Sequence, residues 1–268
     1  MVDLDDKTAL ITGAARGIGQ ATAIELAQAG AHIFGMDLRL EDLQDTAELV
    51  QKVGRKFQGF ACDITDESTT RKMVAEAQKF NTGFHVLVNN AGVLPSGPFV
   101  EQDFDIWRKT VEINLIGLMT VTHATLPYFL SKNQGHIVNI ASIAGKFGTE
   151  GVAAYAASKH GVVGFSSALR AELRDTNIGV SWICPSMANT RIAEGVPDHF
   201  LTPLVQPEDV ARAVRRAIET NAGEVFVPKR VRFVVSILPS LAPDLSRLIL
   251  KWSKASQGWL KAQKEIEI

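Results

Sequence analysis

The chain has 268 residues, 46% of them hydrophobic, and a formal net charge of −1 at pH 7. The near-zero charge argues against a nucleic-acid-binding protein, which would usually carry a basic face. Its two cysteines, Cys62 and Cys184, lie singly in apolar runs, which argues against a disulfide framework or a metal site. The N-terminus carries acids where a signal peptide would carry bases and an apolar segment, so we expect a cytosolic protein.

Up to about residue 228, short apolar runs alternate with longer segments of helical character. Because parallel strands need long crossover connections, this alternation predicts one Rossmann-type α/β domain over 1–228, a doubly wound sheet of seven mostly parallel strands with helices on both faces. Ligands of such folds bind at the carboxyl ends of the strands. The expected strands span 8–12, 32–37, 56–63, 85–90, 135–142, 179–184 and 224–228. The expected helices span 17–29, 40–53, 66–80, 103–130, 155–176 and 208–220.

A glycine-rich turn, TGAARGIG, follows the first expected strand and leads into the first expected helix. Glycine permits the turn geometry and lets the backbone approach a pyrophosphate, which the positive end of the helix then stabilises. Position and context favour a nucleotide-binding turn over a purely structural connection. The residues predicted to bind the nucleotide here are Gly13, Arg16, Gly17, Ile18 and Gly19.

The second expected strand ends in an acid, Asp37. A carboxylate at this distance from the glycine turn can accept hydrogen bonds from the adenosine ribose hydroxyls, and it would repel a phosphate there. This favours NAD over NADP. Two bases, Arg16 and Arg39, could reach a phosphate instead, so NADP stays open as an alternative.

Six short motifs follow one another along the chain. They are TGAARGIG (12–19), CDI (62–64), NNAG (89–92), EINLIG around Asn114, NIAS ending at Ser142, and YAASK (155–159). In this order and at these intervals, the chain resembles a short-chain dehydrogenase/reductase of the classical type over roughly residues 5–228. The resemblance implies an NAD(P)-dependent oxidoreductase that acts on CH–OH groups.

The resemblance also implies how the adenosine half of the cofactor is bound. Asp63 and Ile64 would hold the adenine ring, with the carboxylate facing the exocyclic amine. Asn90 and Ala91 would lie along the adenosine ribose, and Gly92 completes the cofactor-binding NNAG motif.

The nicotinamide half is expected beyond the sixth strand. Family members usually carry Pro-Gly there, followed after three residues by a threonine that contacts the nicotinamide amide. This chain has PSMANT, so Pro185, Ala188 and Thr190 match the pattern, whereas Ser186 replaces the glycine. The replacement adds a side chain beside the expected nicotinamide pocket.

The resemblance assigns a catalytic trio to Ser142, Tyr155 and Lys159, and a proton-path water to Asn114. Residues four apart on a helix lie on one face, so Tyr155 and Lys159 should point the same way. We expect the ammonium to favour the phenolate and to lower the tyrosine pKa from its ordinary value of about 10. Tyr155 would exchange a proton with the substrate while hydride moves to or from the nicotinamide. Ser142 would orient the substrate oxygen, and Lys159 would bind the nicotinamide ribose.

The segments expected to line the substrate site, 93–100, 143–155 and 187–205, are mostly apolar. They hold no cluster of bases for a phosphate or a carboxylate, although Lys146 lies nearby. This predicts an apolar alcohol or ketone, such as a sterol, a retinoid-like molecule or a long-chain lipid. The alternative, that these side chains serve only lid and core packing, stays open. The side chains concerned are Val93, Leu94, Phe99, Phe147 and Val152.

A basic extension, 229–268, follows the last expected strand. It has eight bases and three acids, a local charge of 8 − 3 = +5. Apolar residues at near-helical spacing predict an amphipathic helix, and no apolar run in this extension is long enough to span a bilayer. The helix would pack on the body or a partner subunit, or it would rest on a membrane surface. The apolar residues concerned are Leu245, Leu248, Ile249, Trp252, Trp259 and Leu260.

Two other functions stay open. One is an NADPH-dependent carbonyl reductase that uses Arg16 and Arg39. The other is a nicotinamide-sensing protein without catalysis, which would have little need for a serine, a tyrosine and a lysine at catalytic intervals. The family resemblance implies a homodimer or a homotetramer, formed through the fourth and fifth helices.

Overall fold

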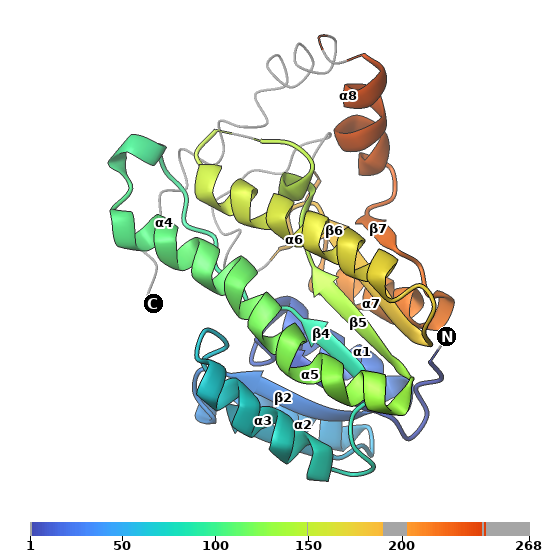
Figure 1. Cartoon of the computed structure of the whole chain (residues 1–268). Coiled ribbons are helices and arrows are strands. Elements are labelled where there is room, and N and C mark those ends of the chain that lie inside the picture. The colour runs from blue at the N-terminus through green and yellow to red at the C-terminus, as the bar shows by residue number, and fades with distance from the viewer. Residues whose placement is uncertain (1, 149, 190–202, 243, 245–268) are drawn as a thin grey trace.

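The computed structural model describes residues 2–148, 150–189, 203–242 and 244. Seven strands form one parallel sheet in the order β3-β2-β1-β4-β5-β6-β7 (Figure 1). This confirms the predicted doubly wound α/β fold. The strands are β1 (Thr8–Thr12), β2 (His32–Asp37), β3 (Phe57–Ala61), β4 (Val86–Asn89), β5 (Gly135–Ile140), β6 (Ile178–Pro185) and β7 (Glu224–Val227).

Helices cover both faces of the sheet (Figure 1). One face carries α1 (Gly17–Gln28), α2 (Gln44–Lys52) and α7 (Pro207–Thr220), whose apolar side chains join one core cluster. The other face carries α3 (Glu67–Lys79), α5 (Leu118–Lys132) and α6 (Ala153–Glu172), which join a second cluster. The short helical turns are η1 (Glu41–Leu43), η2 (Phe99–Glu101) and η4 (Ile143–Gly145).

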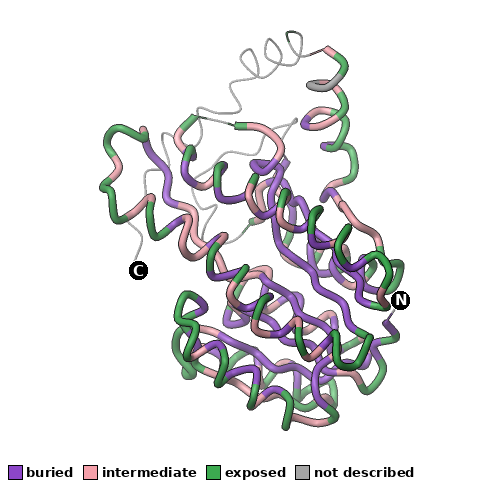
Figure 2. Tube along the Cα trace, viewed as in Figure 1, coloured by how far each residue is buried: buried purple, intermediate pink, exposed green. Residues whose placement is uncertain are grey.

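The core follows from the alternation of side chains along each strand. Leu10 and Phe34 belong to the α3–α5–α6 side, whereas their chain neighbours Ile11 and Ile33 belong to the α1–α7 side. All four are fully buried, and burial of such a side chain contributes about 1.5–3 kcal/mol. Figure 2 shows the buried trace running through the sheet between exposed helix faces. Strands buried on both faces explain the continuous apolar runs in the sequence.

The expected helix 103–130 is one continuous helix from Phe104 to Lys132, made of α4 (Phe104–Val111), η3 (Glu112–Gly117) and α5. Its middle part, η3, is a π-helical turn that contains Asn114. By length and composition this helix could cross a membrane, but Val121 and Phe129 are buried in the core of the domain. We therefore interpret it as a helix of the layer that covers one face of the sheet, with its buried side chains packed in the core.

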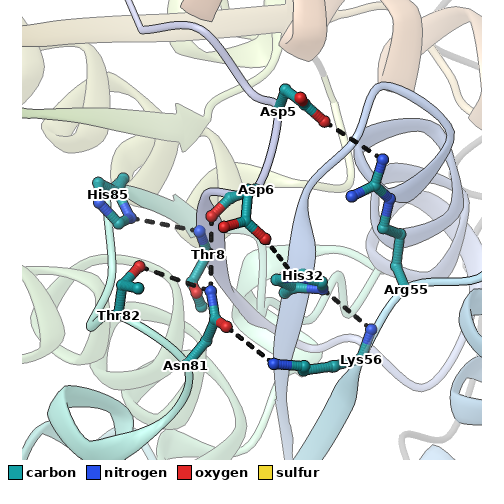
Figure 3. A network of polar contacts seen from close by, with 9 residues as sticks. All are labelled: Asp5, Asp6, Thr8, His32, Arg55, Lys56, Asn81, Thr82 and His85. Carbon is teal, nitrogen blue, oxygen red and sulfur yellow. Dashed lines mark hydrogen bonds and ion pairs between the residues drawn. The ribbon is translucent and has the colours of Figure 1, made fainter.

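The amino ends of the strands are joined by a polar network (Figure 3). His32 accepts the Lys56 N–H at its Nδ1, at 3.0 Å, and its Nε2 lies 2.9 Å from the Asp6 carboxylate. This fixes the proton on Nε2. His85 likewise accepts the Thr8 N–H at 3.3 Å, and burial lowers its pKa. These histidines complete the backbone hydrogen bonding of the sheet at the edge opposite the carboxyl ends.

The first part of the extension packs on the sheet. A helix of two short parts, η6 (Phe233–Ile237) and α8 (Leu238–Leu241), follows β7. Val231 and Val235 are buried against the third core cluster, which includes Trp182 and Phe226. The predicted amphipathic helix over 245–268 lies outside the described residues.

Candidate active site

The glycine turn lies between β1 and α1, with left-handed backbone at Gly13 (φ 64°) and Gly17 (φ 58°). A Cβ on Gly13 would lie 2.9 Å from the Ala91 Cα. A Cβ on Gly19 would lie only 1.9 Å from the Gly13 carbonyl oxygen. Gly13 and Gly19 therefore lie too close to neighbouring atoms to carry a side chain, as expected of a turn whose backbone binds an anion at a helix amino end.

The end of β4 holds this turn in place. The Asn90 side chain donates to the Thr12 and Gly13 carbonyl oxygens, at 3.0 and 2.9 Å. The backbone N–H groups of Asn90 and Ala91 donate to the Thr12 hydroxyl, at 2.9 and 3.0 Å. The structure thus brings the TGAARGIG and NNAG motifs together at neighbouring carboxyl ends.

Asp37 ends β2 beside the same turn. Its carboxylate accepts the Ala15 N–H at 3.0 Å and the Leu38 N–H at 2.9 Å. Arg39 lies nearby but makes a bidentate ion pair with Asp42, at 2.9 Å, and this pair raises the arginine pKa. Arg16 is exposed at the start of α1. Asp37 is therefore held by two backbone N–H groups, and Arg39 is paired with Asp42.

Asp63 and Ile64 follow β3 on the same edge of the sheet. The Asp63 Oδ1 accepts the Thr65 N–H at 2.9 Å and the Thr65 hydroxyl at 2.7 Å, which fixes the carboxylate in a local turn. Ile64 is buried, and its side chain packs against Gly117, where an added Cβ would come within 2.8 Å of it. Both residues adjoin the Asp37 strand, because the Cys62 N–H donates to the Asp37 carbonyl oxygen.

The predicted trio meets at the carboxyl end of β5. Ser142 follows that strand and opens η4, where its hydroxyl accepts the Ala144 N–H at 3.1 Å and lies beside the Tyr155 phenol. Tyr155 lies in the first turn of α6, which begins two residues earlier than predicted. The Lys159 Nζ donates to the Ile140 carbonyl oxygen at 2.8 Å and lies 5.7 Å from the centroid of the Tyr155 ring. The three side chains thus lie close together at the carboxyl end of β5.

Asn114 connects this trio to the β4 loop. Its amide nitrogen donates to the Val93 carbonyl oxygen at 2.9 Å and to the Ser158 hydroxyl at 3.2 Å. Its Oδ1 accepts the Val93 N–H at 2.8 Å. The π-helical turn places this fully buried side chain between α6 and the loop, and such turns often occur at functional sites.

The expectation that Lys159 lowers the tyrosine pKa is wrong for this structure. Burial raises the pKa of Tyr155 to about 12, and the hydrogen bond from Ser142 offsets this only in part. Burial also lowers the pKa of Lys159 to about 8. The ammonium donates to a carbonyl and faces the ring, so desolvation of the phenolate outweighs its attraction.

Ser186, which replaces the glycine usual in the family, directly follows β6. The Ser186 hydroxyl donates to the Pro203 carbonyl oxygen at 2.5 Å, and its N–H donates to the Val227 carbonyl oxygen at 2.8 Å. The side chain therefore ties two chain segments together instead of standing free beside Pro185. Ala188 forms an isolated bridge with Val205, whereas Thr190 lies outside the described residues.

The comparisons with known proteins agree with this geometry. A family model described as short chain dehydrogenase matches residues 7–199. The chain belongs to this family. It is 33% identical to the 17-beta-hydroxysteroid dehydrogenase 13 of Mus musculus, over 90% of this chain and 79% of that protein. It is 38% identical to a putative ketoacyl reductase of Streptomyces coelicolor, over 84% of this chain and 95% of that protein.

A solved structure gives the same result. The structure of a putative short-chain alcohol dehydrogenase from Sinorhizobium meliloti matches with a TM-score of 0.78 and 29% identity, over 85% of this chain and 97% of that one. The chain is therefore a short-chain dehydrogenase/reductase, an oxidoreductase that acts on CH–OH groups.

The apolar residues predicted to line the substrate site of this dehydrogenase have different environments. Val152 is buried just before α6, and Phe147 packs against the third core cluster. Phe99 is 54% exposed on η2 and contacts Trp107, a residue that the sequence did not single out. Lys146 makes an ion pair with Glu224 at 2.9 Å. Nothing in the sequence pointed to Glu224, because it belongs to none of the motifs.

Proposed function

We propose that this dehydrogenase interconverts a secondary alcohol and a ketone, or an aldehyde, on an apolar substrate by hydride transfer with a nicotinamide cofactor. The observation that carries the proposal is the convergence of Ser142, Tyr155 and Lys159 at the carboxyl end of β5. The initial rate of NAD⁺ reduction with apolar secondary alcohols tests it.

The residues at the carboxyl edge fit a dinucleotide. The tight glycine turn leaves the amino end of α1 open for a pyrophosphate, with Ile18 in its first turn, and Asp37 can accept hydrogen bonds from ribose hydroxyls. The nicotinamide supplies or takes up the hydride when the cofactor is bound. Lys159 would hold the nicotinamide ribose, and Pro185, Ala188 and Thr190 would adjoin the nicotinamide.

Tyr155 moves the proton. In the reductive direction its phenol donates a proton to the substrate oxygen as the ketone becomes an alcohol. A pKa of about 12 keeps the phenol protonated at neutral pH, which suits this direction. In the oxidative direction the same oxygen must take the hydroxyl proton as a phenolate, so this direction should be favoured at higher pH. Ser142 hydrogen-bonds the substrate oxygen, and Asn114 would hold a water in the proton path.

The cofactor that we propose is NAD. Asp37 would meet the adenosine ribose, where its carboxylate would repel a 2′-phosphate, and Arg39 is paired with Asp42. We expect Asp37→Ala to weaken NADH binding and to strengthen NADPH binding, each by about tenfold, because the variant loses a ribose acceptor and a repulsive charge. Titration of cofactor fluorescence measures both affinities. Asp45→Asn, an exposed acid on α2, is the matched control and should change neither.

The opposite outcome would favour the second function. If wild type binds NADPH more tightly than NADH, and Asp37→Ala leaves this order unchanged, the protein is an NADPH-dependent carbonyl reductase.

The apolar substrate class is supported by three observations. Lys146, a base at the end of the Ser142 turn, is paired with Glu224 and so is not available for a substrate carboxylate. Val152 is buried just before α6 and Phe147 packs against the third core cluster, so the segment that leads to Tyr155 is apolar at both of these positions. Several similar proteins are named as dehydrogenases of hydroxysteroids or estradiol. We therefore propose a sterol-like, retinoid-like or lipid substrate.

We also propose that this protein is cytosolic and contacts membranes through the basic extension. On the helix after β7, Phe233, Ile237 and Leu241 are exposed four residues apart, while Val235 faces the core. Bases, including Arg232, accompany this apolar row and would attract anionic lipids. We expect full-length protein to float with phosphatidylserine vesicles and to be released by 0.5 M salt (about 4 Å Debye length). Phe233→Ser/Leu241→Ser should bind less, and failure of wild type to float would remove the proposal.

A homodimer or homotetramer is also proposed, since Phe104, Ile116 and Met119 expose apolar surface along the α4–α5 helix.

A further inference from the structure

Glu224, the first residue of β7, joins two segments behind the Ser142 turn. Its Oε1 accepts hydrogen bonds from Lys146 Nζ and from Trp182 Nε1, both at 2.9 Å. Trp182 is its register partner on β6, and Lys146 directly follows η4. The side chains of the ion pair are only 24% and 23% exposed, so solvent and salt screen the pair less than a surface pair.

Other contacts hold the beginning and the middle of the same turn. The Ala141 N–H donates to the Ile183 carbonyl oxygen at 2.8 Å, and the Gly145 N–H donates to the Ser142 carbonyl oxygen at 2.9 Å. Gly145 lies against α6, since an added Cβ would come within 2.6 Å of the Lys159 carbonyl oxygen. The ion pair of Lys146 holds the end of the turn. Ser142 thus lies on a segment that is fixed from its first residue to its last.

We propose that Glu224 is a positioning residue, which holds the Ser142 turn in the geometry for reaction through Lys146. This inference rests on the proposed function, because it requires Ser142 to orient the substrate oxygen. Without the carboxylate charge, the Lys146 ammonium loses its partner in a shielded place and turns toward solvent. The end of the turn is then released. Reaction rates fall steeply when reacting groups are displaced by fractions of an ångström, so the effect appears in kcat.

Two single variants, a double variant and a control test this inference in the full chain. Glu224→Gln and Lys146→Met should each lower kcat about tenfold and leave the cofactor Kd unchanged. The double variant Lys146→Glu/Glu224→Lys restores opposite charges but leaves the Trp182 indole N–H without its acceptor, so its kcat should rise above that of either single variant. Amide hydrogen exchange in residues 142–147 should increase in the single variants and return in the double variant. Glu76→Gln, which removes an exposed ion pair on α3, should match wild type in every measurement.

The outcomes separate the inference from the function beneath it. Wild-type kcat in Glu224→Gln overturns the inference, whether or not amide exchange changes. A loss of kcat that the charge-swapped double variant does not reduce also overturns it, because the ion pair is then not the cause. If wild type itself turns over no alcohol or ketone, the proposed function fails, and amide exchange alone still decides whether the ion pair holds the turn.

Discussion

Tyr155→Phe should lose turnover by about a thousandfold and bind NADH as tightly as wild type. General acid–base catalysis typically contributes between about a hundredfold and ten-thousandfold, and the phenol is the group placed to exchange the proton. Removing one oxygen leaves the ring, the Lys159 contact and the glycine turn in place. Steady-state kinetics in both directions, together with NADH fluorescence titration, measure the two effects separately.

The other tyrosine of the chain provides a matched control. Tyr128 lies on α5 and packs against Phe84, with ring centroids 4.3 Å apart. Tyr128→Phe should retain wild-type turnover. Comparable rates in Tyr155→Phe and wild type would contradict the assignment of the proton transfer to Tyr155.

The pH dependence of the same variants has a defined sign. Because burial raises the pKa of Tyr155 to about 12, the phenol is protonated through the neutral range. The reductive rate should therefore stay level near neutrality and fall only at strongly alkaline pH. The oxidative rate needs the phenolate and should rise with pH, by up to tenfold per pH unit below the working pKa. In Tyr155→Phe, the residual reductive and oxidative rates should no longer differ in their dependence on pH.

Gly19→Ala should abolish measurable cofactor binding, with a loss of at least about a hundredfold in affinity. The new Cβ would lie 1.9 Å from the Gly13 carbonyl oxygen and 2.6 Å from the Asn90 side-chain nitrogen. Backbone atoms cannot move out of the way cheaply, so the turn must open and displace the N–H groups that would bind the pyrophosphate. Calorimetric titration with NADH measures the loss, and circular dichroism checks that the fold persists.

Gly164 on α6 provides a control for the same substitution, because its surroundings are open whereas those of Gly19 are crowded. No atom lies within 4 Å of a Cβ added there, beyond its own helix. Gly164→Ala should bind NADH normally and should raise the free energy of unfolding by about 0.5–1 kcal/mol, since glycine weakens helix interiors. Normal NADH affinity in Gly19→Ala would show that this turn does not bind the pyrophosphate.

The sequence was sufficient for the strands and most of the helices because each strand is a short apolar run bounded by polar or glycine residues. The predicted strand 135–142 ends at Ile140 instead, since Ala141 and Ser142 already belong to the turn that leads into η4. The π-helical turn at Asn114 could not be predicted. The segments before and after it each keep the apolar spacing of an ordinary α-helix, so one extra residue between them leaves no pattern to recognise.

At the candidate site, some features were predictable from the sequence and others were not. Ordered motifs placed Tyr155 and Lys159 together, because residues four apart must share a helix face. The direction of the tyrosine pKa was missed, since sequence spacing reveals a neighbouring charge but not the burial that opposes it. Glu224 was missed for a related reason. Its contact with Lys146 joins residues 78 apart in the chain, and only the β6–β7 pairing brings them together.

The measurement that tests the central claim most directly is the initial rate of NAD⁺ reduction by wild type across secondary alcohols of increasing apolar size, ending in sterols. We expect a rate that rises with apolar size and depends on Tyr155. The absence of turnover throughout the series, with NADH still bound tightly, would contradict a dehydrogenase of apolar alcohols and would favour a protein that binds nicotinamide cofactors without catalysis.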